Sequence, residues 1–213
     1  MIETRTDGRI LRGEQTRKAI LRRAVDIASA EGLEGLSIGR LSTELQISKS
    51  GVFTHFGSKE ELQLATVRAA VEIFVDSVVK PAHANPAGVR RVWGTFEAWL
   101  DYERQPVFAG GCFFYTVGAE FDARPGRVKD AVAHALADWL KLYERNIAEA
   151  IRMGEIVEGT DARRLAFELD AFATRAASMA HLHDDPSAYA LGRAAALSRL
   201  RGVVADPSLL PSA

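Results

Sequence analysis

Residues 36–62 read LSIGRLSTELQISKSGVFTHFGSKEEL, and this stretch decides the fold. Leu41 and Leu45 lie four residues apart in its first half. Val52 and Phe56 have the same spacing in its second half. A spacing of four residues places two side chains on one face of a helix, so each pair forms a narrow apolar stripe that another helix must cover. The stretch therefore predicts two short, mutually packed helices joined by a tight turn, a helix-turn-helix.

The second of these helices is predicted to begin after Ser48, a favourable N-cap residue. With its apolar pair directed inward, a rotation of about 100° per residue points Ser50 and Thr54 outward. Gly51 and Phe53 are then expected at the sides. Small polar side chains near a helix N-terminus suit the major groove of DNA. Because of this surface, the second helix is predicted to be a recognition helix.

A third helix is predicted to follow, with Ser58 as its N-cap and Lys59 in its first turn. The partial positive charge at a helix N-terminus attracts phosphate, as does the lysine cation. The apolar residues that follow predict that this helix continues to about residue 79, where Pro81 would stop it. The sequence thus predicts a contact to the DNA backbone at the start of a long helix.

The chain resembles the TetR-like transcriptional regulators over nearly its whole length. The family pattern begins with a long helix that ends at a glycine, here Gly32, and that carries the apolar residues Ile20, Ala24, Ile27 and Ala28. It closes with a specific exit motif, here Gly57-Ser58-Lys59-Glu60-Glu61-Leu62. Two positions depart from the pattern. Gln46 stands in the turn where such sequences usually carry glycine, and Phe53 replaces the usual tyrosine of the recognition helix.

This resemblance implies an all-α fold with two domains that have different functions. We expect a helix-turn-helix DNA-binding domain at residues 13–60, followed by an effector-binding and dimerisation domain at residues 61–204. A flexible basic arm is expected at residues 1–12, and a disordered tail at residues 205–213, where Asp206, Pro207 and Pro211 favour irregular structure.

Composition agrees with an intracellular DNA-binding protein. The 213 residues are 47% apolar, which is enough for a sizeable core, yet no apolar run is long enough to predict a membrane span or a signal peptide. The single cysteine fits a reducing cytoplasm. The net charge is only −1, but seven Lys or Arg residues fall between positions 5 and 23. They concentrate positive charge on the expected arm and first helix.

The predicted DNA contacts divide into two groups. Ser50, Gly51 and Thr54 are expected to face base edges, and Lys49 to reach a base or a phosphate. The complete predicted set is Ser37, Arg40, Ser48, Lys49, Ser50, Gly51, Phe53, Thr54, His55 and Lys59. Of these, Ser37, Arg40, His55 and Lys59 are expected to hold the phosphate backbone.

Two helices predicted at residues 161–183 and 186–201 are rich in small residues. Small side chains allow close helix packing, and in the resembled family the last two helices of each subunit pair as a four-helix dimer bundle. The alternative is that alanine serves there only as a good helix former. The predicted homodimer interface comprises Ala173, Ala177, Ala180, Ala190, Ala194 and Leu197.

Aromatic residues in the C-terminal part have two interpretations. They form the core, or some of them surround a pocket for a small apolar or aromatic effector. The predicted pocket residues are Trp93, Phe96, Trp99, Phe113, Tyr115, Trp139 and Phe172. An effector bound there would shift the helix at residues 58–79 and so release the DNA.

Cys112 offers an alternative mode of control. A helix N-terminus can lower the pKa of a thiol, so a redox- or electrophile-sensing regulator is conceivable, although a buried and inert cysteine is the simpler interpretation. No catalytic constellation, metal site or cofactor motif is present in the sequence. The sequence therefore predicts a cytoplasmic, non-enzymatic repressor that binds a palindromic DNA operator as a homodimer. The remaining alternative is a helical interaction module without specific DNA binding.

Overall fold

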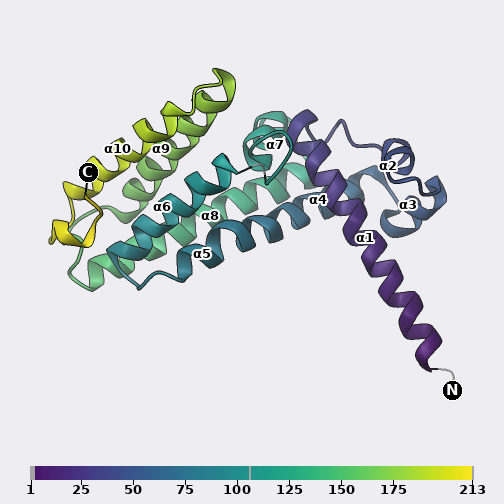
Figure 1. The fold of residues 1–213 in the computed structure, drawn as a ribbon, viewed down its shortest axis with the longest axis horizontal. Coiled ribbons are helices and arrows are strands. Elements are labelled where there is room, and N and C mark those ends of the chain that lie inside the picture. Colours follow the sequence, from purple (N-terminus) through teal and green to yellow (C-terminus); the bar gives the residue numbers. More distant parts are fainter. Residues whose placement is uncertain (1–2, 106, 213) are drawn as a thin grey trace. The chain divides into compact units, whose positions relative to one another are not determined.

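The computed structural model describes residues 3–105 and 107–212, and their regular structure is helical throughout, which confirms the all-α class (Figure 1). No β-strand occurs in these two ranges, where Ile156 and Val204 form an isolated antiparallel bridge. The elements are α1 (Glu3–Glu31), α2 (Ile38–Leu45), α3 (Lys49–Phe56), α4 (Lys59–Phe74), the π-helical turn η1 (Val75–Val79), α5 (Lys80–His83), α6 (Val89–Arg104), α7 (Phe113–Phe121), α8 (Arg127–Arg152), α9 (Ala162–Leu182), α10 (Ser187–Arg201) and the 3₁₀ turn η2 (Pro207–Leu209).

The chain forms two compact units. Unit 1 comprises residues 1–72 and 108–133, and unit 2 comprises residues 73–107 and 134–213. These units do not follow the expected boundary at residue 60, because α7 and the start of α8 belong to the same unit as the N-terminal helices. The reason lies in packing at the end of α1, where α7 lies against it.

The core of unit 1 contains the stripes that the sequence predicted. On α1, Ile20, Ala24 and Ala28 are fully buried. Leu41 on α2 and Val52 on α3 are also fully buried, whereas Leu45 is only partly covered. Helix α2 packs on α3 and on α1, as the apolar stripes predicted.

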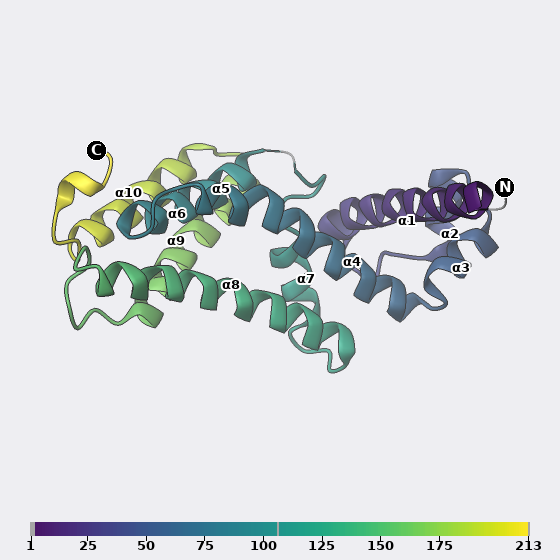
Figure 2. The same cartoon turned by 90° about the horizontal axis from the view of Figure 1, so that it is seen from below.

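The core of unit 2 is built from α6, α8, α9 and α10. Tyr143 of α8 is fully buried, and its hydroxyl donates to the carbonyl of Val92 on α6 at 3.3 Å. Helices α9 and α10 lie side by side as an antiparallel hairpin (Figures 1 and 2). Gly192 of α10 allows this close approach, because a Cβ atom at this position would lie 2.6 Å from the Cβ atom of Ala176.

Pro81 does not stop the helix, contrary to the sequence prediction. Helix α4 passes into the π turn η1 and then into α5, which contains Pro81 and ends at His83. The wider π turn, in which Lys80 donates to the carbonyl of Val75, changes the register just before the proline ring. A regular turn would place that ring against the carbonyl of the residue four positions earlier.

Both chain ends are more regular than expected. Residues 3–12 of the expected basic arm form the first part of α1, and residues 1–2 lie outside the described part. The tail is ordered over residues 205–212, since the amide of Ala205 donates to the carbonyl of Glu155 at 2.9 Å and Leu210 is buried. Its prolines shape the turn η2, which Asp206 caps through the amide of Ser208.

Candidate DNA-binding interface

The turn between α2 and α3 is held by side-chain caps. The hydroxyl oxygen of Ser37 accepts the amide of Arg40 at 3.1 Å, and that of Ser48 accepts the amide of Gly51 at 3.0 Å. Between the helices, Gln46 adopts a left-handed conformation with φ of 56°. Gln46 therefore performs the turn for which the sequence pattern usually provides a glycine, at the cost that a side chain brings in this region.

Helix α3 exposes a continuous face. Lys49, Ser50, Phe53 and Thr54 are exposed, while Gly51 and His55 are partly covered. Phe53 therefore lies on the open face of the helix rather than at its side. The hydroxyl of Thr54 donates to the carbonyl of Ser50 at 2.7 Å, which leaves its oxygen available as an acceptor.

Arg40 is held by carboxylates within unit 1. Its guanidinium group donates to Glu31 at 2.7 Å and to Glu44 at 2.9 Å, and Glu44 also accepts a bond from Arg23. The hydrogen bond from Arg40 is the main reason that the pKa values of Glu31 and Glu44 lie below their ordinary range. Arg40 thus links α1 to α2. To contact a DNA phosphate, its guanidinium group would have to give up its ion pairs with Glu31 and Glu44.

Lys59 is also held by a carboxylate within unit 1. Its ammonium group donates to the carboxylate of Glu34 at 2.9 Å and to the Glu34 carbonyl at 3.1 Å. Gln63 adds a bond to the carbonyl of Leu33 at 3.0 Å. The Glu34 carboxylate also accepts a bond from the Gln63 amide at 3.2 Å. The bond from Lys59, followed by this one, lowers the pKa of Glu34, and the contacts together fix the first turn of α4 against the end of α1.

Glu120 of α7 completes this arrangement in a role that the sequence did not predict. Its carboxylate accepts the amides of Leu33 at 2.6 Å and of Glu34 at 2.9 Å, just after Gly32, where φ is +78°. These N–H groups follow the helix end and need acceptors. Glycine at position 32 was a visible signal for the helix end, but the carboxylate that fills the space lies 87 residues from Leu33 in the sequence.

The seven residues predicted to line an effector pocket are not brought together in one unit. Phe113 and Tyr115 belong to unit 1, whereas the other five belong to unit 2. Phe113 is fully buried and Tyr115 is exposed. In unit 2, Trp99 packs edge-on against Trp139 at a centroid distance of 5.7 Å, as expected for core aromatic side chains.

Asp170 gives this aromatic core a polar group. Its carboxylate accepts the indole N–H of Trp139 at 2.9 Å. Burial raises the pKa of Asp170 above its ordinary value, although the bond from Trp139 acts in the opposite direction. Asp170 is thus a partly buried carboxylate bound to an indole ring, a polar group among apolar neighbours.

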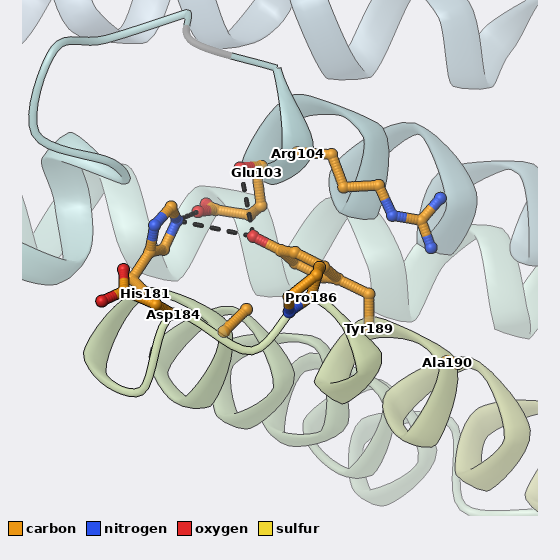
Figure 3. A pocket seen from close by; sticks show the side chains of 8 residues that line it. Glu103, Arg104, His181, Asp184, Pro186, Tyr189 and Ala190 are labelled. Atoms are coloured by element: carbon orange, nitrogen blue, oxygen red, sulfur yellow. Dashed lines mark hydrogen bonds and ion pairs between the residues drawn. The ribbon is translucent and has the colours of Figure 1, made fainter.

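A cavity of about 540 Å³ lies elsewhere in unit 2, at the C-terminal ends of α6 and α9 and the start of α10 (Figure 3). Its polar groups converge on Glu103, whose side chain is only 1% exposed. The hydroxyl of Tyr189 donates to the Glu103 carbonyl at 3.2 Å, and Nε2 of His181 lies 3.6 Å from its carboxylate. The lining residues are Glu103, Arg104, Ala180, His181, Asp184, Pro186, Tyr189 and Ala190, and none of them is one of the seven aromatic residues predicted for the effector pocket.

The predicted dimer residues fall into two groups. Ala173, Ala177, Ala180 and Leu197 are buried within the chain, where they help to pack unit 2. Ala190 and Ala194 are exposed on α10. The same helices also expose three large apolar side chains, Phe167, Leu182 and Leu191.

Other predicted features remain without a test. Cys112 is partly exposed at the N-cap position of α7. Within residues 3–105 and 107–212, no group of three or more His, Cys, Asp or Glu side chains is placed to hold a metal ion. In the same ranges no helix has the length and apolar character that crossing a membrane requires.

Two profiles of one protein family match this chain. The family profile described as "Bacterial regulatory proteins, tetR family" matches residues 20–66, and the profile described as "Tetracyclin repressor-like, C-terminal domain" matches residues 88–196. The HTH-type transcriptional regulator TcmR of Streptomyces glaucescens is 28% identical over 156 residues, which are 71% of this chain and 59% of TcmR. The chain thus spans less than two thirds of the length of that relative.

Solved structures share the fold at lower identity. A TetR transcriptional regulator from Chloroflexus aurantiacus J-10-FL has a TM-score of 0.84 at 22% identity, covering 91% of this chain and 98% of that one. A transcriptional regulator from Saccharomonospora viridis in complex with choline has a TM-score of 0.75 at 19% identity, covering 91% of this chain and all of the other.

Proposed function

This chain belongs to the TetR family of bacterial transcriptional regulators, and from that premise we propose that it is a ligand-responsive repressor. It binds an inverted-repeat DNA operator as a homodimer in the cytoplasm and leaves the operator when a small molecule binds. The observation that carries this proposal is the exposed face of α3, where Lys49, Ser50 and Thr54 present a cation and two hydroxyl groups beside each other.

The contacts within unit 1 support a division of roles in DNA binding. Ser50 and Thr54 are the groups proposed to meet bases, with Gly51 allowing close approach, and Lys49 is proposed to reach a phosphate or a base. Ser37 and Ser48 act mainly by capping the helices, which directs the first amides of each helix toward the duplex. Arg40 orients α2 and Lys59 orients α4 through their ion pairs with Glu31 and Glu34. Either side chain reaches a phosphate only if the phosphate replaces its carboxylate partner.

Exposed apolar side chains on α9 and α10 support the homodimer. Leu191 is 63% exposed and Phe167 is 65% exposed. The exposed residues Ala190 and Ala194 of α10 have small side chains, so they allow another helix to approach Leu191 closely. Two copies of such a surface can pack as an isologous interface. A dimer also matches an inverted repeat, whose half-sites are related by the same twofold symmetry.

The effector is proposed to be a small apolar or aromatic molecule that binds unit 2. The aromatic side chains Trp93, Phe96, Trp99, Trp139 and Phe172 supply apolar surface, and Asp170 supplies a polar group among them. A structural relative is in complex with choline, which supports a small organic ligand for a chain of this fold. Phe113 and Tyr115 remain predictions, since they lie in unit 1.

The test is selection of duplexes from a random DNA pool, followed by fluorescence anisotropy against excess nonspecific DNA. We expect an inverted repeat to be enriched and Thr54→Ala to lose most of the preference for it. A chain that binds all duplexes equally would show that specific operator recognition is wrong. Effector candidates are then screened by tryptophan fluorescence, and a true inducer must bind less tightly to the operator complex than to the protein alone.

A further inference from the structure

Phe53 is an apolar side chain on a surface that is otherwise polar. Its side chain is 54% exposed on α3, whereas the neighbouring Val52 and Phe56 are buried. Between residues 13 and 72, all of which are described with their side chains, no other large hydrophobic side chain is so exposed. Packing within unit 1 therefore does not account for a phenylalanine at this position.

The position of Phe53 on the helix decides what the ring can meet. At about 100° per residue, Phe53 lies about 40° from Lys49 and about 60° from Ser50 around the axis of α3, between the two. A duplex that both of these side chains contact must therefore also lie against the Phe53 ring. The ring has no hydrogen-bonding group, so it cannot bind a phosphate oxygen or the polar edge of a base.

The major groove offers one apolar group to such a ring, the 5-methyl group of thymine. We propose that Phe53 contacts a thymine methyl group in each half-site of the operator, so that a T·A pair at this position determines part of the sequence preference. This inference rests on the proposed DNA-binding function of α3. It assigns Phe53 to direct base recognition, whereas a ring that only touched the sugar–phosphate backbone would not distinguish bases.

Replacing thymine with uracil tests the contact, because uracil keeps the base pair and lacks only the methyl group. In the selected operator, each thymine position is changed to uracil in turn, in both half-sites together. At one position the wild-type protein should lose affinity about fourfold for each methyl group, or about sixteenfold for the two half-sites, as expected when a buried methyl contact is removed. At the other positions uracil should have little effect.

Two variants connect this effect to the side chain. Phe53→Ala should bind the thymine operator more weakly and should bind the uracil operator with the same affinity as the thymine one. Ser50→Ala, on the same face of α3, should also weaken binding but should retain the full dependence on the methyl group. Circular dichroism should show that both variants are folded, because both positions are exposed.

The outcomes separate this inference from the function on which it rests. If an operator is enriched and bound but no uracil substitution weakens the wild-type protein, the methyl contact is wrong and the DNA-binding function stands. The same holds if Phe53→Ala keeps the wild-type dependence on the methyl group. If no duplex is enriched at all, the proposed function itself fails, and the methyl contact fails with it.

Discussion

Lys49 is the lysine of α3, and no ion pair holds it among the described residues, in contrast to Lys59, which contacts Glu34. Lys49→Ala should therefore reduce the slope of log affinity against log salt by about one unit in each protomer, because one phosphate neutralisation is lost. Lys59→Ala should reduce it less. Binding is measured between low and moderate salt, and Lys141→Ala on α8 is the matched control. Equal slopes for Lys49→Ala and the wild type would exclude Lys49 as a phosphate contact.

Asp170 makes the stability of unit 2 depend on pH. The pKa of Asp170 in the folded state lies above the unfolded value of about 3.8, so the folded state holds the proton more tightly. The stability of the folded state therefore falls as the pH rises from the unfolded pKa through the folded pKa. Asp170→Asn keeps an acceptor for Trp139 and removes the charge. The variant should be more stable than the wild type at pH 7, with a smaller difference at pH 4. Urea unfolding followed by tryptophan fluorescence measures this, with the exposed Asp138→Asn as control; a variant less stable at pH 7 would contradict the argument.

At the scale of single residues, the sequence predicted what depends on neighbours in the chain. The caps Ser37 and Ser48 follow from residue type and position, because their hydroxyl oxygens accept amides only three residues away. The partners of Arg40 and Lys59 could not be predicted, since Glu31 and Glu34 belong to another helix or its end. Glu120 is further still from the amides that it accepts. Such pairs depend on tertiary packing, which local patterns do not specify.

At the scale of elements, the spacing of small residues predicted helices correctly but not which contact they make. The alanines of α9 were expected at a dimer interface, yet Ala173 and Ala177 are buried within unit 2. Small side chains permit close packing against any partner, so composition alone cannot distinguish a neighbour in the same chain from a second copy. The π turn at the end of α4 was equally invisible, because it is a change of register rather than of pattern.

Gly192→Ala tests this close packing between α9 and α10. Alanine favours a helix more than glycine does, but its methyl group would lie 2.6 Å from the Cβ atom of Ala176 and 3.1 Å from the carbonyl oxygen of Phe172. We expect the collision to dominate and to destabilise unit 2 by about 1–3 kcal/mol. Gly13→Ala in α1 is the control, because no atom lies within 4 Å of its new methyl group. It should stabilise the chain by up to about 1 kcal/mol. A stabilised Gly192→Ala would show that the two helices can separate at no cost.

At the scale of the whole molecule, the exposed side of α10 is the sharpest place to test the homodimer. Glutamate at Ala177 would disturb unit 2 itself, because that position is buried. Leu191→Glu instead places a charge on a side chain that is 63% exposed, so the protomer should fold normally while the dimer pays the full cost of burying a carboxylate. Sedimentation should show monomers, and circular dichroism should show unchanged helix content.

Loss of the dimer should also change DNA binding in a defined way. Two linked recognition helices bind the half-sites together, and separating them should weaken operator affinity by about 10²–10⁴-fold, while a single half-site is bound as before. Val157→Glu, at an exposed apolar residue after α8, is the matched control and should leave a dimer with wild-type affinity. If Leu191→Glu and Ala194→Glu both sediment as dimers, the interface lies on another surface. If they sediment as monomers yet bind the full operator as tightly as the wild type, the operator does not require two copies.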